Sequence, residues 1–272
     1  MGPRVTLGFS VDALLPRARG GGVLKMGLAA LSEDEWLDPD PDLSAREAGF
    51  AAYPDGIQLA PEGEAPAREL AAMLGIGGGL PEAAKVRWED MCLLTRRGDE
   101  DFYRLVGAAV AFPSDWRPAE KMGLPLAAMH APIQGYAEQL ASGVDRFIAG
   151  LAPGRIFGRC NWFIAATPAL RWVAEPPEQA FAHVTPENAG ETLFVRSERQ
   201  TLRRLPETGA ILFTIGVYVA PLGALSHANV TRLAGAMEKL LAGEGDRRGA
   251  PCYAAALQGF AQTREAAIGS PV

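Results

Sequence analysis

The stretch FPSDWRPAEKMGLPLAAMHAPIQGY, residues 112–136, joins the end of an expected strand to a proline-rich turn, a short apolar run and one histidine, His130. His130 follows Leu126 and Met129 in the apolar run and stands two residues before Pro132. Burying an imidazole with an unsatisfied nitrogen costs about 1 to 3 kcal/mol. His130 is therefore expected either to pair with a protein group or to ligate something.

Directly after the turn, the sequence predicts helical structure. Pro125 can open a short helical turn over Leu126–His130, which Pro132 closes by pushing the residue before it towards extended geometry. Residues Tyr136–Leu151 carry apolar side chains at helical spacing, with charged side chains on the other faces. This segment is the clearest amphipathic helix in the chain.

The remaining downstream part is expected to form strands and then helices. The strand-like segments are Ile156–Ala165, Thr192–Leu202 and Ala210–Val219. A loop containing Pro and Gly joins the last two, as is typical of a hairpin. Asn229 is expected to cap a helix that runs to Leu241, and Tyr253–Arg264 is expected to form one more helix at the surface.

Upstream, two apolar segments, Met91–Thr95 and Leu105–Phe112, are separated by the turn candidate Gly98-Asp99 and predict a hairpin. These two strands and the three downstream ones predict a mainly antiparallel five-stranded sheet with flanking helices, an α+β fold. The chain is expected to form one domain, 1–272, with an irregular N-terminal arm at 1–85, a core at 86–242 and a C-terminal tail at 243–272.

The arm is irregular because residues 1–65 are rich in Gly, Pro and acidic residues. Within it, Ser32 with Glu35 three residues later predicts a helix start. A second helix is expected at Pro66–Leu74. The glycine run 75–79 is open to two interpretations, a phosphate-binding loop or a plain helix stop, and it follows a helix rather than a strand.

Composition excludes several classes of protein. A net charge of -6 disfavours general nucleic-acid binding, which needs clustered basic residues. No apolar run reaches the roughly 20 residues of a membrane helix, and no secretory signal is visible, so a cytoplasmic location is expected. The three cysteines form no Cys-x-x-Cys pair, which argues against a zinc ribbon, an iron–sulfur cluster, a disulfide framework or covalently attached haem.

Six short motifs carry a resemblance to a known family. They are, in order, EDMCLL at 89–94, FPSDW at 112–116, KMG at 121–123, MHAP at 129–132, RCNW at 159–162 and RSERQTLRRLP at 196–206. Together they resemble the haem-dependent oxidative N-demethylase family over roughly Gly27–Leu241. The resemblance implies a PAS-like domain that binds b-type haem noncovalently through a histidine and uses O2 to remove a methyl group from a small alkylamine such as dimethylamine. It also implies a separate reductase or electron-transfer protein containing flavin or iron–sulfur groups.

Within this resemblance, His130 is the expected axial ligand of the haem iron, because imidazole is the usual ligand where b-type haem handles O2. Strand alternation places Arg196, Glu198 and Gln200 on one face and Arg199 on the other. Such a polar strip can be an exposed sheet face or a pocket lining. If it lines a pocket, Arg196 or Arg199 is expected to pair with haem propionates and Glu198 to accept from an alkylammonium substrate.

The preceding strand offers polar contacts of the same kind, from Arg159 and Asn161. Trp116 and Trp162 are open to two interpretations, core packing or a flat ring against the porphyrin. Cys160 is a conceivable thiolate ligand, although burial favours the inert thiol. Two further functions stay open beside the demethylase, a haem-based gas or redox sensor and a scaffold without cofactor or turnover.

Overall fold

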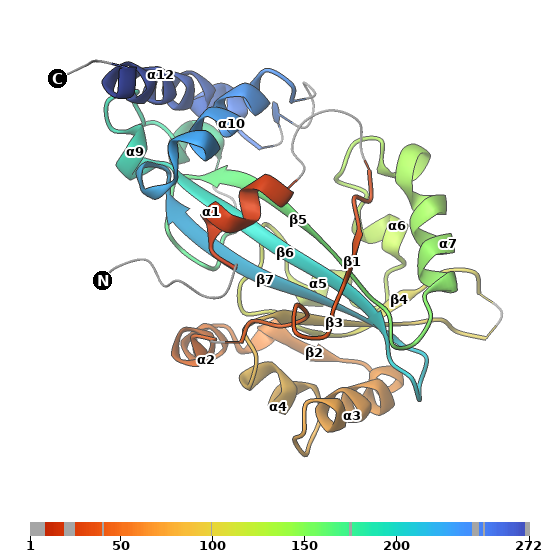
Figure 1. The fold of residues 1–272 in the computed structure, drawn as a ribbon. Coiled ribbons are helices and arrows are strands. Elements are labelled where there is room, and N and C mark those ends of the chain that lie inside the picture. Colours follow the sequence, from red (N-terminus) through yellow and green to blue (C-terminus); the bar gives the residue numbers. More distant parts are fainter. Residues whose placement is uncertain are drawn as a thin grey trace.

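The computed structural model of the chain describes residues 9–18, 25–39, 41–98, 100–173, 176–240, 245–246 and 248–269. Its central feature is an open sheet in the order β1-β5-β6-β7-β3-β4-β2 (Figure 1). The strands are β1 (Ala29–Leu31), β2 (Ile57–Leu59), β3 (Asp90–Thr95), β4 (Arg104–Ala109), β5 (Ile156–Ala165), β6 (Phe194–Arg204) and β7 (Ile211–Pro221). Neighbouring strands all pair antiparallel, so the chain has an α+β fold.

The five strands predicted from the sequence form the five consecutive strands β5, β6, β7, β3 and β4, and both predicted hairpins are confirmed. The predicted number of strands was wrong, because the sheet has seven. Two three-residue segments of the N-terminal arm add β1 to β5 and β2 to β4, at the two edges of the sheet. Segments this short do not repeat the alternation of apolar and polar residues often enough to be recognised.

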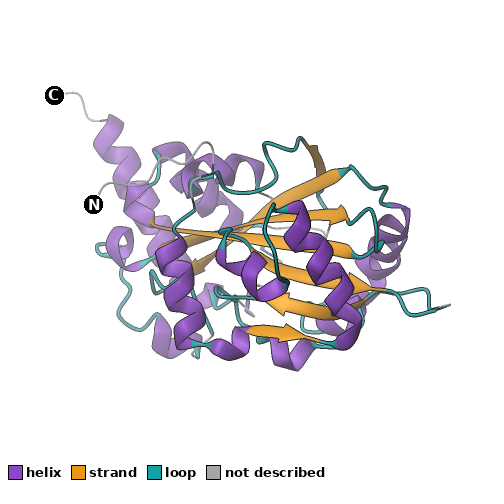
Figure 2. Ribbon diagram, turned by 90° about the horizontal axis from the view of Figure 1, so that it is seen from below, coloured by secondary structure: helices purple, strands orange, loops and turns teal. Residues whose placement is uncertain are grey.

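Helices and single helical turns cover the sheet on both sides (Figures 1 and 2). The α-helices are α1 (Val11–Leu14), α2 (Leu43–Ala52), α3 (Glu64–Met73), α4 (Leu80–Lys85), α5 (Pro118–Lys121), α6 (Leu126–Met129), α7 (Ser142–Gly150), α8 (Pro177–Ala180), α9 (Ala189–Thr192), α10 (His227–Met237) and α12 (Ala250–Gly269). The 3-10 turns are η1 (Leu15–Arg17), η2 (Pro54–Gly56), η3 (Pro61–Gly63) and η5 (Leu222–Ala224), and η4 (Ala137–Ala141) is a π turn.

Several predicted helices are confirmed with adjusted ends. The predicted helix 66–74 is α3, and the predicted helix 136–151 is the π turn η4 followed by α7. Asn229 lies inside α10 and does not cap it, because its side chain amide donates to the backbone and side chain of Asp12 at 2.7 Å. Leu241 and Asp99, at the ends of two predicted features, lie outside the described residues.

The helix predicted to start at Ser32 does not form, although its capping hydrogen bonds do. The amide and hydroxyl of Ser32 donate to Oε2 of Glu35 at 3.1 and 2.8 Å, around a turn only. Pro39 and Pro41 follow closely, and a proline inside a helix removes a backbone donor and clashes with the preceding turn. The local cap therefore has no helix to stabilise.

The C-terminal helix is longer and more buried than predicted. Residues 253–264 lie inside α12, where Tyr253 and Leu257 are buried in one cluster with Val230 and Leu233 of α10. The expectation of a surface helix was wrong because these apolar side chains have a partner helix to pack against. Among the described residues, no helix is both long and apolar enough to cross a membrane.

The glycine run 75–79 is a helix stop followed by a helix start. Gly75, with φ of 73°, ends α3 in the left-handed region. The amide of Gly79, just before α4, donates to Oε2 of Glu82 at 2.8 Å. A carboxylate of the chain thus takes the position in which a phosphate would have to sit, so the helix-stop interpretation holds.

Side chains alternate between the two faces of the sheet, and each face has its own cover. Met91 and Leu93 of β3 belong to the core shared with α2, α3 and α4. Leu94 packs on the opposite face with Leu126 of α6 and Ile148 of α7. We call this second side the α7 face, and it is the side that carries the candidate site.

Candidate functional site

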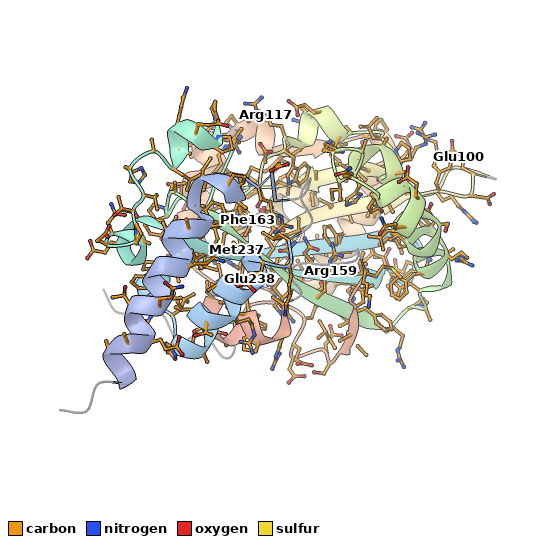
Figure 3. The ribbon with its side chains drawn as sticks, turned by 90° about the horizontal axis from the view of Figure 1, so that it is seen from above. Glu100, Arg117, Arg159, Phe163, Met237 and Glu238 are labelled. Carbon is orange, nitrogen blue, oxygen red and sulfur yellow. The ribbon has the colours of Figure 1, made fainter. Side chains whose placement is uncertain are left out.

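A cavity of about 1420 Å³ lies on the α7 face, between the sheet and the segment from α6 to α7. Sites for small molecules usually occupy about 300 to 1,000 Å³, so this one has room for a large ligand. Its apolar lining includes Leu94, Leu105, Leu126, Met129, Phe147, Phe213 and Ile215, and its polar lining includes Ser114, Lys121, His130, Arg159, Asn161, Glu198 and Gln200. Residues 25–28 of the arm and Arg248 also line it. Figure 3 shows Arg159 and Phe163, both from β5, near the centre of the molecule and Glu100 at its edge.

His130 lies at the C-terminal end of α6, on the wall opposite the sheet. Its Nδ1 is 2.8 Å from the carbonyl oxygen of Leu126, which can only accept, so Nδ1 carries the proton. The ring stacks on Tyr136, with centroids 4.5 Å apart and planes 10° from parallel. Burial lowers the pKa of His130 below its ordinary value. The side chain is therefore a neutral imidazole whose Nε2 keeps its lone pair, the form in which histidine ligates metals.

The wall around His130 is held by contacts of its own segment. Lys121 donates from Nζ to the carbonyl of Met129 at 3.2 Å, which satisfies one of the free carbonyls at the end of α6. The π turn η4 follows Tyr136 and contributes Gln139 and Leu140 to the cavity lining. Single π turns are frequent at functional sites, because they shift the side chains that follow.

Glu198 lies on the sheet side of the cavity with donors to both carboxylate oxygens. The Ser114 hydroxyl donates to Oε1, and Oε2 accepts from the amides of Asn161 at 3.3 Å and Gln200 at 2.9 Å. Glu198 is only 8% exposed. Three neutral donors orient this carboxylate without supplying a cationic partner at hydrogen-bonding distance.

Arg159 stands beside Glu198 on the neighbouring strand. Its Nε donates to Oε1 of Gln200 at 2.7 Å and its Nη1 to the carbonyl of Met26 at 3.2 Å. Burial lowers the pKa of Arg159 from its ordinary value, although a guanidinium stays charged in proteins. Arg159, Asn161, Glu198 and Gln200 thus form one polar row on the sheet, as the alternation predicted for each strand.

Arg196 lies on the same face of β6 as Glu198, but its N–H groups donate to other groups of the protein. Its Nε donates to the Ser114 hydroxyl at 2.9 Å, and its two terminal nitrogens reach four carbonyls, those of Phe112, Pro113, Ala169 and Leu170. All five N–H groups are thereby used. Burial lowers the pKa of Arg196 to about 10. Arg196 clamps the loop that carries Ser114 and does not line the cavity.

Two other predicted site residues lie on the opposite face of the sheet. Arg199 donates from Nη1 to the carbonyl of Trp36 at 2.9 Å and sits over the ring of Phe9. Trp162 is buried in the core shared with α10 and α12. Trp116, by contrast, is half-buried and lines the cavity. Of the residues singled out from the sequence, the cavity brings together His130, Trp116, Arg159, Asn161 and Glu198, and it leaves out Arg196, Arg199 and Trp162.

The other histidines and the cysteines do not add ligands at the cavity. His183 is exposed, and His227 begins α10 away from the lining. Cys92 and Cys160 line the cavity, but burial raises the pKa of both thiols, which favours the inert protonated form. The described residues contain no group of three or more His, Cys, Asp or Glu that could hold a metal ion.

Sequence reasoning offered Glu89 and Asp90 as a cap, a partner contact or a carboxylate of the site, and it did not foresee that both are buried at the start of β3. Asp90 pairs with Arg46 at 2.9 Å, with both side chains almost fully buried. Glu89 accepts from the amide of Asp38 at 2.7 Å, and its Oε2 is buried without a hydrogen-bond partner among the described residues. Burial raises the pKa of Glu89 to about 7. The run EDMCLL is thus a structural anchor for the arm as well as a strand.

Replacing Glu89 with glutamine is expected to change how stability depends on pH. The pKa of Glu89 is about 7 in the fold and about 4.3 in an unfolded chain. Because the fold binds the proton more tightly, the stability that this group contributes is lost as pH rises through the folded pKa. Glu89→Gln cannot ionise, so it should be more stable than the wild type by on the order of 3 to 4 kcal/mol at pH 8 and nearly equal at pH 4. Urea unfolding of the wild type and the variant at pH 4 and pH 8 measures this difference. The same difference in the free energy of unfolding at both pH values would contradict the prediction.

The fold and its cavity define the class: an α+β protein with a large cavity between its sheet and a helical wall carrying one neutral histidine. The chain belongs to the haem-dependent oxidative N-demethylase, alpha subunit-like family, whose family model matches residues 80–255, more than half of its length. This confirms the family predicted from the six motifs. The family implies a haem cofactor and a chain that is one subunit of a multi-subunit oxidase.

Proposed function

We propose that this chain is the haem-binding subunit of an oxidative N-demethylase, with a noncovalent b-type haem on a PAS-like scaffold and a small N-methylamine as substrate. The observation that carries the proposal is the neutral His130 on the wall of a cavity of about 1420 Å³, with Nδ1 bound to the carbonyl of Leu126 and Nε2 without a hydrogen-bond partner among the described residues. Within a family that depends on haem, such an imidazole is suited to hold iron.

The residues of the cavity fit this cofactor. His130 would hold the haem iron through Nε2, and the apolar side chains of Leu126, Met129 and Phe213 would contact the cofactor. Lys121 uses one of its three N–H groups for Met129, so it could offer the others to a propionate. When bound, the haem iron supplies O2 binding and the oxidation of the N-methyl carbon.

The polar row would hold the amine. A secondary or tertiary alkylamine is cationic near neutral pH, and Glu198 offers an oriented carboxylate to it. In the overall reaction, O2, two electrons and two protons convert the N–CH3 group to N–H and formaldehyde, and the second oxygen atom leaves as water. The electrons would come from a separate flavin or iron–sulfur protein, in keeping with a family named for one subunit of a larger oxidase.

The test loads the purified chain with haem and supplies dimethylamine, O2 and a surrogate reductant. Formaldehyde release that depends on all four components is expected. Tight binding of O2 or CO without any formaldehyde would contradict the proposal and favour a haem-based sensor. Absence of a Soret band after haem loading would contradict haem binding itself and favour a scaffold without cofactor.

Substituting Glu198 with glutamine is expected to weaken amine binding while leaving the haem spectrum unchanged. The amide keeps the size of the side chain but removes the charge that attracts an alkylammonium. Hydrogen bonds to charged groups contribute about 1.5 to 3 kcal/mol, so the KM for dimethylamine should rise about tenfold or more. Glu120→Gln, at an exposed carboxylate paired only with Arg117 at 3.5 Å, is the matched control. An unchanged KM in Glu198→Gln would remove Glu198 from the substrate site.

A further inference from the structure

The polar row on the sheet has a positive end as well as a negative one. In the antiparallel register Arg159 stands opposite Gln200, and Asn161 stands opposite Glu198. Arg159 and Glu198 are therefore diagonal neighbours, whose side chains start about 7 to 8 Å apart on the sheet. Both face the same cavity.

Gln200 links these two ends and fixes their orientation. Its carbonyl accepts from Nε of Arg159 at 2.7 Å, and its amide donates to Oε2 of Glu198 at 2.9 Å. The amide cannot turn over without losing both bonds, because the oxygen would then face the carboxylate and the nitrogen would face the guanidinium. The sheet thus presents a cation and an anion at a set separation, joined by one neutral side chain.

Arg159 retains unused donors, unlike its neighbour Arg196. Only two of its five N–H groups have acceptors among the described residues, Gln200 and Met26, and Nη2 has none there. Arg196, on the next strand, uses all five. A guanidinium with free N–H groups at a cavity wall is suited to a bidentate bond with a carboxylate.

The polar row carries one negative charge, on Glu198, and one positive charge, on Arg159, and these charges favour one kind of ligand over another. A simple alkylammonium ion would neutralise Glu198 and leave the positive charge of Arg159 beside it without a counterion. A ligand that carries both an ammonium and a carboxylate group matches both ends and leaves the row neutral. Both charged groups bind the same amide of Gln200, at 2.7 and 2.9 Å, so they lie close enough together for one small ligand to contact both.

We propose that the substrate of this chain is an N-methylated amino acid, whose ammonium group binds Glu198 and whose carboxylate binds Arg159. The assignment of the bound amino acid as a substrate rests on the proposed function. Its binding to Glu198 and Arg159 does not depend on that function. A carboxylate could also come from a haem propionate, and the experiment distinguishes the two sources.

The experiment compares dimethylamine with N-methylglycine and its ethyl ester on the haem-loaded protein, by calorimetry and by formaldehyde release. N-methylglycine differs from dimethylamine by one carboxylate, and the ester removes that charge while adding an ethyl group. N-methylglycine is expected to bind about tenfold or more tightly than either of the others, since one charge-assisted bidentate contact is gained. Equal or tighter binding of dimethylamine or the ester would overturn the proposal, and this comparison needs no variant.

The variant Arg159→Met is expected to lose the preference for N-methylglycine over dimethylamine. Arg159→Lys, which keeps the charge but not the fork, should restore part of the preference. A weaker haem affinity in Arg159→Met, with the amine preference unchanged, would assign Arg159 to a propionate and overturn the proposal. Arg159-dependent binding of N-methylglycine without formaldehyde would support the binding site while contradicting the proposed N-demethylase activity.

Discussion

The variant His130→Ala should lose its Soret band, or bind haem at least 100-fold more weakly than the wild type. Loss of groups that merely orient a metal ligand typically costs about 10- to 100-fold in metal affinity, and removal of the ligand itself should cost more. His130 has no neighbour that could replace it, because the other described histidines do not line the cavity. Absorption spectra during haem titration measure the effect.

Two further variants distinguish the loss of an iron ligand from a failure of the variant to fold. His130→Gly leaves space for free imidazole, which should restore the spectrum when added to the buffer. His183→Ala, at an exposed histidine outside the cavity, should bind haem like the wild type. Retention of the wild-type spectrum and affinity by His130→Ala would show that another group holds the iron.

The buried pair of Arg46 and Asp90 is expected to dominate the stability of the arm. Arg46 is 0% exposed and Asp90 1%. Arg46 also donates to the carbonyls of Ala84 and Trp88, and Asp90 accepts from the amides of Ala111 and Phe112. Arg46→Ala leaves the carboxylate buried without its cation, which costs about 3 to 5 kcal/mol in the free energy of unfolding.

Urea unfolding measures this cost, and the matched control is a pair at the surface. Arg97 and Glu62 also lie close, at 2.6 Å, but their side chains are 53% and 42% exposed. Arg97→Ala should therefore change the free energy of unfolding by less than about 1 kcal/mol. A loss of less than about 1 kcal/mol in the free energy of unfolding of Arg46→Ala would contradict this prediction. It would mean that the buried charge of Asp90 is removed in another way, such as by protonation.

The sequence pattern located the sheet and the polar strip well, because both depend on local periodicity. The segment 156–165 was predicted with both ends correct, and alternation placed Glu198 and Gln200 on one face and Arg199 on the other. Alternation fixes which side chains share a face, but not which face meets a cavity. That depends on where α6 and α7 fold back, which is a long-range contact.

Features that join distant parts of the chain could not be predicted in this way. The pair of Arg46 and Asp90 spans 44 residues, and the clamp from Arg196 to the loop at Phe112 spans 84. Arg46 looks like an ordinary charged residue in its local sequence, and Arg196 was expected to pair with a haem propionate rather than with this loop. The Ser114 hydroxyl likewise joins distant residues, since it bridges Arg196 and Glu198, 82 and 84 residues further along the chain.

The lining of the cavity draws on residues 25–28 near one end of the chain and on Arg248 near the other. β1 reaches its partner β5 across more than a hundred residues, with Ala29 opposite Gly158. Contacts of such long sequence separation form slowly, since a large loop must close first. During synthesis the pocket can therefore be finished only after Arg248 has emerged from the ribosome, and capture of its ligand should follow that step.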